Sequence, residues 1–332
     1  MGDEAATEAT SSTAGTGATS GTSGTSGTSG TSGSAVSGGY PPEKHFVRDL
    51  DAETWQVTAE RVVMVAPLPA AQRNHAGTAA LGFLAALVDI ACAPVALIAG
   101  APDWTATQDM SLHATGWLSQ GPAIADAHLR RAGRNTVVVA VDVYDGRGDD
   151  DIDAAVAAID ALHLDGADGA GGDGPVLATR GLLTFARIPR SASAAAGRFE
   201  PEKLVGQKRS MDPVEPVVGP MFERIGLELV DGAAGVVQIH RTDYVRNSFG
   251  TINGGVLGAV FQGAAEAMCP GMVATDVSIH YLSQVQEGPA RTRATVSRRT
   301  GDHAVVNLEA VDAGHGDQLL DLATVTLQVP PG

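Results

Sequence analysis

Residues 247–268, NSFGTINGGVLGAVFQGAAEAM, decide the fold of this chain. A polar loop punctuated by glycine leads into apolar residues with the spacing of one helix face: Val256, Leu257, Val260 and Phe261. A helix this apolar is expected in a core. Its first N–H groups have no partner within the helix, and Gly254 and Gly255 leave them open to a ligand. The stretch therefore predicts a buried helix whose amino end can hold an anion or an oxyanion.

This stretch has a counterpart earlier in the chain. Residues 74–89 (NHAGTAALGFLAALVD) align without a gap with residues 247–262 (NSFGTINGGVLGAVFQ). Downstream, residues 107–122 (TQDMSLHATGWLSQGP) align without a gap with residues 274–289 (ATDVSIHYLSQVQEGP), so that an Asp, a His and a Gly-Pro turn coincide. Agreement in order, residue type and spacing indicates a tandem duplication. Each unit is expected to contain a loop, a long central helix and a run of antiparallel strands.

The pattern outside the repeat divides the chain into parts. We expect a disordered Gly/Ser/Thr-rich tail at residues 1–39, a first unit at 40–190 with an acidic insertion at about 146–174, a linker at 191–205 and a second unit at 206–332. The insertion is expected to be a solvated surface with a short helix at residues 152–162. Strands are expected at residues 55–66, 107–113, 136–144, 176–188, 222–229, 235–240, 275–282, 291–298, 305–311 and 319–329.

Composition restricts the partners. The net charge of −16 argues against nucleic acid and against anionic membrane surfaces. We expect no membrane span, because no apolar run reaches the length that a span requires. We also expect no secretory signal, because the amino terminus lacks a basic region before an apolar core. Cys92 and Cys269 lie in apolar helical patterns without metal-ligand spacing, which predicts buried, reduced thiols in a cytoplasmic protein.

The repeated unit resembles the hotdog fold. Its loop and helix are similar to the phenylacetate-type (PaaI-like) acyl-CoA thioesterases, whose pattern is N-x-x-G-x-x-H-G-G followed by a helical acid, and the D-x-S-I-H-Y-L strand and Gly-Pro turn are also similar. The resemblance implies an α+β fold in which an antiparallel sheet wraps one long helix. Two tandem units would pair as a double hotdog with active sites between them. It further implies an acyl-CoA substrate, no metal or redox cofactor, and self-association into a homo-oligomer of double units.

The resemblance also implies catalytic residues. In the family, the backbone N–H of the first Gly in the H-G-G motif polarises the thioester carbonyl, the loop Asn positions carbonyl or water, and an acid from the partner unit acts as base or nucleophile. The second half of this chain supplies Asn247 and Gly254, and the first half supplies the acid, Asp89. Asn253 stands where the family has His. The substrate-binding residues implied with them are Asn253, Gly255 and Gln262.

The second composite site lacks both parts. Leu81 stands at the position of the oxyanion Gly, and Gln262 stands at the position of the acid, so this site is expected to be inactive. Glu266, one turn beyond Gln262, is an alternative acid. A carboxylate on an apolar helix is costly unless it has partners or a raised pKa, so Asp89 also admits a purely structural reading in which hydroxyl groups satisfy it.

Three functions compete on these residues. The first is hydrolysis of an acyl-CoA thioester. The second is a non-catalytic acyl-CoA-binding protein, which Asn253 and Gln262 favour. The third is a hotdog hydratase, which is disfavoured because the loop carries Asn247 and Asn253 in place of an Asp–His pair. His113 and His280 are expected to be structural, because neither has a companion at metal spacing.

Overall fold

The structure is a computed structural model that describes residues 40–165, 174–189 and 200–330. The predicted tail and most of the predicted linker lie outside these ranges. The helices are α1 (Leu81–Gly100), α2 (Ile152–Asp165), α3 (Met221–Arg224) and α4 (Gly254–Met268), with 3-10 turns at Arg48–Leu50, Ala70–Gln72 and Pro201–Leu204. The strands of the first half are β1 (Ala52–Thr58), β2 (Arg61–Ala66), β3 (Trp104–Ala114), β4 (Ala123–Ala132), β5 (Thr136–Asp145) and β6 (Val176–Ile188). They are followed by β7 (Lys208–Met211), β8 (Glu228–Asp231), β9 (Val236–Ile239), β10 (Val273–Tyr281), β11 (Ala290–Arg299), β12 (His303–Asp312) and β13 (Gln318–Gln328).

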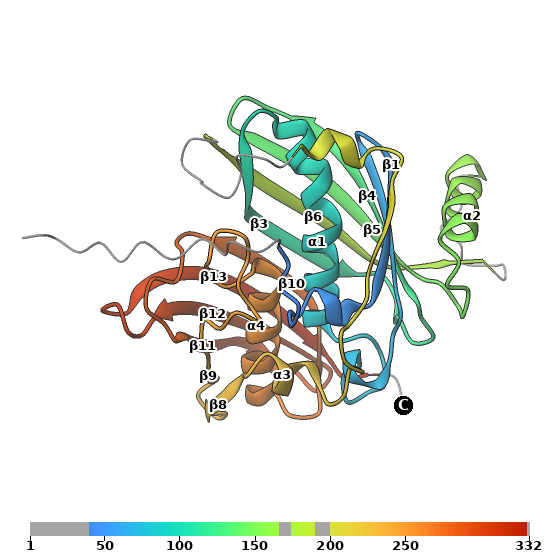
Figure 1. Cartoon of the computed structure of the whole chain (residues 1–332). Coiled ribbons are helices and arrows are strands. Elements are labelled where there is room, and N and C mark those ends of the chain that lie inside the picture. Colours follow the sequence, from blue (N-terminus) through green and yellow to red (C-terminus); the bar gives the residue numbers. More distant parts are fainter. Residues whose placement is uncertain (1–39, 166–173, 190–199, 331–332) are drawn as a thin grey trace, which may run out of the picture. The chain divides into compact units, whose positions relative to one another are not determined.

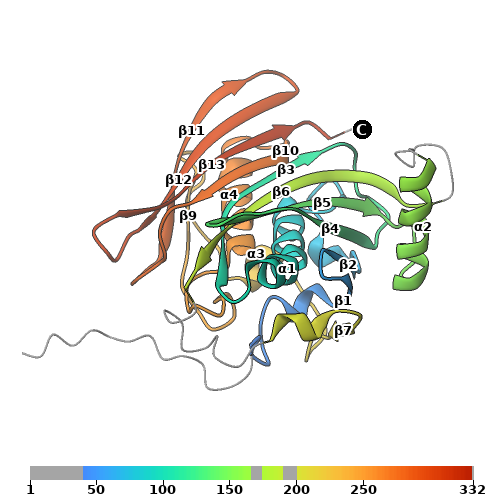
Figure 2. The same ribbon diagram turned by 90° about the horizontal axis from the view of Figure 1, so that it is seen from above.

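All the described strands form one 13-stranded antiparallel sheet. Its order is β7-β1-β2-β4-β5-β6-β3-β10-β13-β12-β11-β9-β8. Outward from the β3–β10 junction, the strands β3-β6-β5-β4-β2-β1 of one half correspond in order to β10-β13-β12-β11-β9-β8 of the other. The sheet curves around α1 in one half and around α4 in the other (Figures 1 and 2). Each half is therefore a long helix wrapped by antiparallel strands, as the repeat predicts.

The junction between the halves explains the repeated Asp-x-Ser-x-His motif. Ser111 of β3 lies opposite Ser278 of β10, which is its own equivalent in the repeat, so the two strands are related by an approximate twofold axis at this pair. The equivalent Asp and His residues consequently meet across the junction. His280 Nδ1 lies 2.6 Å from Asp109 Oδ1 and His113 Nδ1 lies 3.4 Å from Asp276 Oδ1. The predicted structural role of both histidines is supported by these cross-strand pairs.

Glycines let the two long helices approach closely. A Cβ atom on Gly82 would lie 2.4 Å from the Cβ of Ala259, and one on Gly255 would lie 2.5 Å from the Cα of Ala86. Gly82 near the start of α1 meets Ala259 in α4, and the later Ala86 meets the earlier Gly255. The two helices therefore run antiparallel. Their closest approach thus depends on glycine at both amino ends, which are also the ends that carry the candidate sites.

We expect Gly255→Ala to destabilise the fold by about 1–3 kcal/mol, because its Cβ would press on the backbone of Ala86 and cannot be relieved by turning a side chain. Gly263→Ala is the matched control on the same helix, since the one atom that its Cβ would crowd is Leu227 Cδ2, at the end of a flexible side chain. Chemical denaturation of both variants measures the effect. Equal unfolding free energies would contradict the close backbone approach.

Several expected elements differ in the structure. Residues 55–66, whose composition predicts strands, lie in the hairpin β1–β2, with the turn between Thr58 and Arg61. The strand expected at residues 222–229 begins instead with the short helix α3, which starts directly after the extended Pro220. Strand β4 was not expected, since its basic end resembles a solvated segment. Strand β7, which belongs by sequence to the expected second unit, pairs with β1 at the edge of the first half.

The acidic insertion is only partly the solvated surface that composition predicts. Its helix α2 lies on the outer face of the sheet, opposite α1 (Figure 1). One face of α2 is buried against β2, β4 and β5, and this outer cluster contains Ile152, Ala155, Val156, Ile159, Val63, Val65, Ile124, Tyr144 and Leu177. The sheet of the first half therefore has apolar side chains on both faces.

Helix α1 corrects the expectation that no apolar run reaches the length of a membrane span. An 18-residue window of its 20 residues has a mean hydropathy of 2.3, enough by length and composition to cross a membrane. In the fold, 72% of that window is buried, because the strands of the first half wrap the helix. Cys92 on α1 and Cys269 after α4 are buried free thiols, as expected.

A repeated carboxylate holds each Gly-Pro turn. Asp145 accepts hydrogen bonds from the backbone N–H groups of Ser119, Gln120 and Gly121. Its equivalent Asp312 accepts from Gln286, Glu287 and Gly288. Burial alone would raise the pKa of Asp312, but these three donors outweigh it and the pKa is lowered. The same turn is thus built twice by the same contacts.

Candidate functional site

Asp89 lies at the middle of the fold, on the face of α1 that meets the amino end of α4. Its side chain is buried, with 6% of the residue exposed. The Thr107 hydroxyl of β3 donates a hydrogen bond to Asp89 Oδ1 at 2.7 Å. The side chain of Asn253 and the backbone N–H of Gly255 also act on the carboxylate from the other half of the chain. The acid of one half therefore contacts the helix start of the other half.

Burial determines the protonation of this carboxyl group. Desolvation raises the pKa of Asp89, and the hydrogen bonds from Thr107, Gly255 and Asn253 oppose that rise without cancelling it. A carboxyl group with a raised pKa that is held next to a helix amino end is typical of acid–base sites. The group can therefore act as an acid or a base that takes up and returns a proton.

The amino end of α4 has an N-cap residue with a side-chain hydrogen bond. Asn253 has extended backbone angles and its Oδ1 accepts the Gly255 N–H at 2.8 Å. Asn253 thus caps the helix in the position where the resembled family has His. Gly254 is the first helical residue, so its N–H has no partner within the helix. Tyr281 of β10 packs on Gly254, and the Tyr281 hydroxyl donates to the Gly254 carbonyl at 2.8 Å.

Asn247 lies within the loop that precedes α4. Its Oδ1 accepts the backbone N–H groups of Phe249 at 2.9 Å and Thr251 at 3.3 Å. Asn74 makes the same contacts in the first half, with Ala76 and Thr78. The repeated Asn therefore shapes the loop. The structure brings Asn253 and Gly255 to Asp89, with Gly254 between them in the chain, whereas it shows Asn247 in contact with its own loop.

The pseudo-equivalent site has different chemistry. Gln262 Oε1 accepts the backbone N–H of Gly82 at 2.7 Å, which is the counterpart of the contact between Asp89 and Gly255. Gln262 Nε2 in turn donates to Glu266 Oε1 at 2.9 Å, and the backbone N–H of Ala274 donates to the same oxygen at 3.0 Å. Burial raises the pKa of Glu266 against these hydrogen bonds. Gln262 is thus a neutral partner of the α1 amino end, with the acid displaced by one turn.

Thr107 was missed by the sequence reasoning, although the repeat contains a signal for it. Thr107 aligns with Ala274, so the hydroxyl that holds Asp89 exists only in the half that has the acid. The asymmetry of the two sites therefore extends to a third position. A hydroxyl at the start of a strand reads as an ordinary strand residue until its partner on another element is known.

Two more side chains with ionisable groups act on residues of this site. Tyr40, at the start of the described chain, is partly exposed, and its hydroxyl group forms a hydrogen bond with Asn253. Desolvation and the Asp89 charge both raise the pKa of Tyr40, so its phenol remains a donor. Desolvation also raises the pKa of Asp321, a buried carboxyl without a hydrogen-bond partner whose charge acts on Tyr281. Neither residue was expected from the sequence.

One known protein family matches part of the second half of the chain. Residues 244–328 match the family described as acyl-CoA thioesterase N-terminal domain. The match begins just before the loop of α4 and ends with β13, so it covers less than half of the chain. No curated protein sequence matches the chain.

Solved structures are similar over most of their length. The 12:0-ACP thioesterase from Umbellularia californica has a TM-score of 0.51 at 8% identity, with 81% of this chain and 94% of that chain covered. The tesB protein from Mycobacterium avium subs paratuberculosis has a TM-score of 0.49 at 13% identity, covering 87% and 100%. A conserved hot dog fold protein from Alicyclobacillus acidocaldarius has a TM-score of 0.48 at 12% identity, covering 87% and 99%. At these identities the first of them supports a shared fold and nothing finer.

Proposed function

We propose that this chain hydrolyses acyl thioesters at one composite site between its two halves. The observation that carries the proposal is the meeting of Asp89 with the amino end of α4, where Asn253, Gly254 and Gly255 lie. The matched thioesterase family at residues 244–328 supports the same reaction class. The arrangement combines a carboxyl group of raised pKa with N–H groups at a helix start, which are the two parts that attack on a thioester carbonyl requires.

In the proposed reaction, the Asp89 carboxylate takes a proton from a water molecule as the water oxygen attacks the thioester carbonyl carbon. The carbonyl oxygen becomes an oxyanion, which the Gly254 N–H stabilises at the positive end of α4. The carbon–sulfur bond then breaks, and the departing thiolate takes the proton from Asp89. Direct attack by the Asp89 carboxylate, followed by hydrolysis of the anhydride, uses the same residues.

Thr107, Asn247 and Asn253 have supporting roles in this proposal. Thr107 fixes the rotamer of Asp89 through its hydrogen bond, and Asn253 presents the helix amino end to the site. Asn247 keeps the loop in shape by accepting two backbone N–H groups, and we propose that its side chain also positions carbonyl or water. Gly255 and Gln262, proposed as substrate-binding residues, make the equivalent helix-to-helix contacts described above.

The architecture is proposed to be a double hotdog of the phenylacetate-type (PaaI-like) kind. The palindromic strand order, the twofold register at Ser111 and Ser278 and the antiparallel long helices support it. The pairing that a single unit would make with a second copy is made here within one chain. We further propose an acyl-CoA substrate, a cytoplasmic location and self-association of the double units.

The proposed activity is tested by measuring free thiol release from a panel of acyl-CoA and acyl-carrier-protein thioesters of different chain length. We expect saturable turnover with at least one acyl-CoA. Turnover of acyl-carrier-protein thioesters alone would show that the substrate is an acyl carrier protein and not acyl-CoA. Binding of acyl-CoA without any thiol release would instead support the non-catalytic binding protein, which the neutral Gln262 at one acid position favours.

A further inference from the structure

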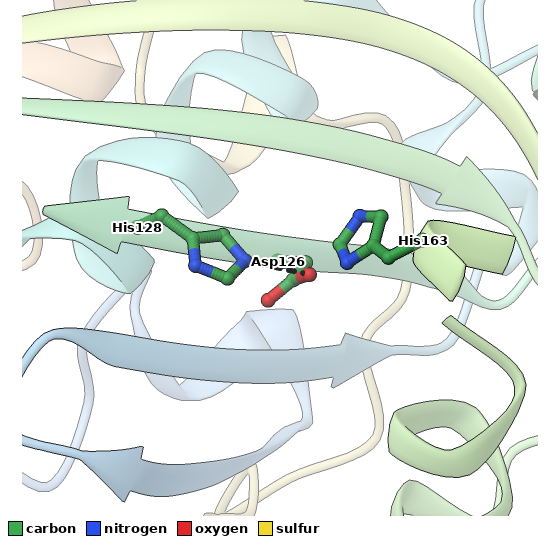
Figure 3. Close-up of side chains that lie close together, drawn as sticks. All are labelled: Asp126, His128 and His163. Atoms are coloured by element: carbon green, nitrogen blue, oxygen red, sulfur yellow. Dashed lines mark hydrogen bonds and ion pairs between the residues drawn. The ribbon is translucent and has the colours of Figure 1, made fainter. Parts of the chain in front are cut away.

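A cluster of polar side chains lies on the outer face of the sheet, on the side away from α1. Asp126 and His128 point outward from β4, because the neighbouring Ala125 and Ala127 belong to the inner core. His163 lies in the last turn of α2, which packs on that outer face. Figure 3 shows the three side chains directed toward one another. None of them takes part in the site proposed for thioester hydrolysis.

The three side chains offer ligand atoms at short range. One nitrogen of each imidazole and one carboxylate oxygen of Asp126 all lie within 4.8 Å of one another. His128 Nε2 is 2.9 Å from Asp126 Oδ2, and the rings of His128 and His163 have centroids 6.0 Å apart. Within the described ranges this is the one group of three His, Cys or acidic side chains that meets this distance. Two imidazoles and a carboxylate form a recurring ligand set of divalent transition metals.

The carboxylate of this group is buried and fixed. Asp126 is 1% exposed, and Arg61 Nε donates to Asp126 Oδ1 at 2.9 Å. Arg61 Nη1 also donates to Asp160 of α2 at 2.5 Å, so one guanidinium connects the sheet carboxylate to the helix that carries His163. A metal-ligating carboxylate is commonly held in this way by a further hydrogen-bond donor. A ligand that is pre-oriented in this way loses less conformational entropy when a metal binds.

Carboxylates and guanidinium groups surround the three candidate ligands. Asp126 lies directly opposite Asp142 of β5, and Asp160 lies beside them, so three carboxylates face Arg61 and the Arg180 that pairs with Asp142. Arg130 also acts on Asp142, so the three carboxylates are matched by three guanidinium groups. The hydrogen bond between His128 and Asp126 would be replaced by a shared metal ion, which keeps both groups satisfied.

We propose that Asp126, His128 and His163 bind a divalent transition metal of the zinc class, with water as the fourth ligand. Zinc–nitrogen bonds of about 2.0–2.1 Å in a tetrahedron place neighbouring ligand atoms roughly 3.3 Å apart, so the 4.8 Å group closes by small rotations. His163 is exposed and can make most of that movement. Calcium and magnesium are disfavoured, because they take oxygen ligands and two of the three ligands are imidazoles. The bound metal would clamp the carboxyl end of α2 to the sheet.

The test is to measure zinc binding by the full-length chain, without an affinity tag, by isothermal titration calorimetry with zinc chloride. We expect one Zn²⁺ per chain and a melting temperature that rises with zinc concentration, because a ligand bound to the folded state stabilises it. His163→Ala and His128→Ala should each weaken binding at least about tenfold and reduce the thermal shift. Cobalt chloride should give the visible absorption of a tetrahedral site in the wild type and not in these variants.

His280→Ala is the matched control, since His280 also forms an exposed pair with a carboxylate, Asp109, but has no second imidazole. It should bind zinc as the wild type does. The exposed His163 makes His163→Ala the variant least disturbing to the fold, and circular dichroism checks each chain. Absence of stoichiometric zinc binding, or equal zinc affinity in the wild type, His163→Ala and His128→Ala, would overturn the proposal.

Discussion

Asp89→Asn is expected to lower thioester turnover by at least about 10²-fold while thioester binding is largely retained. The expected size follows from the contribution of general acid–base groups, which typically amounts to about 10²–10⁴ in rate. The amide has nearly the same shape as the carboxyl group and can still contact Thr107 and the amino end of α4. Steady-state thiol release gives the rate, and titration with a non-hydrolysable thioether analogue of acyl-CoA gives the affinity. Full turnover in the variant would show that the base lies elsewhere.

The same substitution has an expected effect on stability. Burial raises the pKa of Asp89 in the fold, so the folded state holds its proton more tightly than the unfolded chain does. The contribution of this group to stability is therefore fully present below the ordinary aspartate pKa and is lost as the pH rises through the raised value. At neutral pH, Asp89→Asn should melt at the same temperature as the wild type or higher. Wild-type turnover should increase with pH as the carboxyl ionises.

Gly254→Pro is expected to abolish turnover because proline removes the N–H that is proposed to stabilise the oxyanion. Loss of one such donor typically costs about 10²–10³ in rate. The backbone accepts the change: Gly254 is the first helical residue, a position that suits proline, and Asn253 before it is extended with φ −67° and ψ 142°. The helix should therefore remain intact, as circular dichroism would show.

Gly254→Ala separates the loss of the N–H from the added side chain. A Cβ at this position would lie 3.1 Å from the Tyr281 ring, so both variants press on Tyr281, but alanine keeps the N–H. We expect the alanine variant to retain much more activity than the proline variant. Leu81→Pro, at the equivalent position of α1, should affect stability at most. Equal loss in Gly254→Ala and Gly254→Pro would indicate that crowding of Tyr281, and not the oxyanion donor, explains the effect.

The repeat in the sequence predicted the features that depend on equivalent residues. Both long helices and their wrapping strands follow from the alignment, which also places His113 and His280 at equivalent strand positions. The contact partners of those histidines did not follow, because they depend on the register at Ser111 and Ser278, which only the folded sheet defines. Gly255 shows a similar limit: a glycine at a helix start predicts a ligand site, and the structure adds a close approach to Ala86.

Contacts between elements distant in the chain were beyond the sequence. Thr107 reads as a strand residue until α1 brings Asp89 to its hydroxyl. The acidic insertion reads as solvated, because its charge conceals that one face of α2 is apolar and covers the sheet. The cluster of Asp126, His128 and His163 joins a strand to this insertion, and neither segment alone has metal-ligand spacing.

The central claim is that only one of the two pseudo-equivalent sites is active. Its most direct test is the value of kcat/KM for Asp89→Asn and Glu266→Gln, measured side by side on the same thioester. Glu266 is half-buried and has a raised pKa like Asp89, but its neighbour at the α1 amino end is Gln262. The proposal predicts a loss of at least about 10²-fold for Asp89→Asn and little change for Glu266→Gln. Equal losses in the two variants would contradict it.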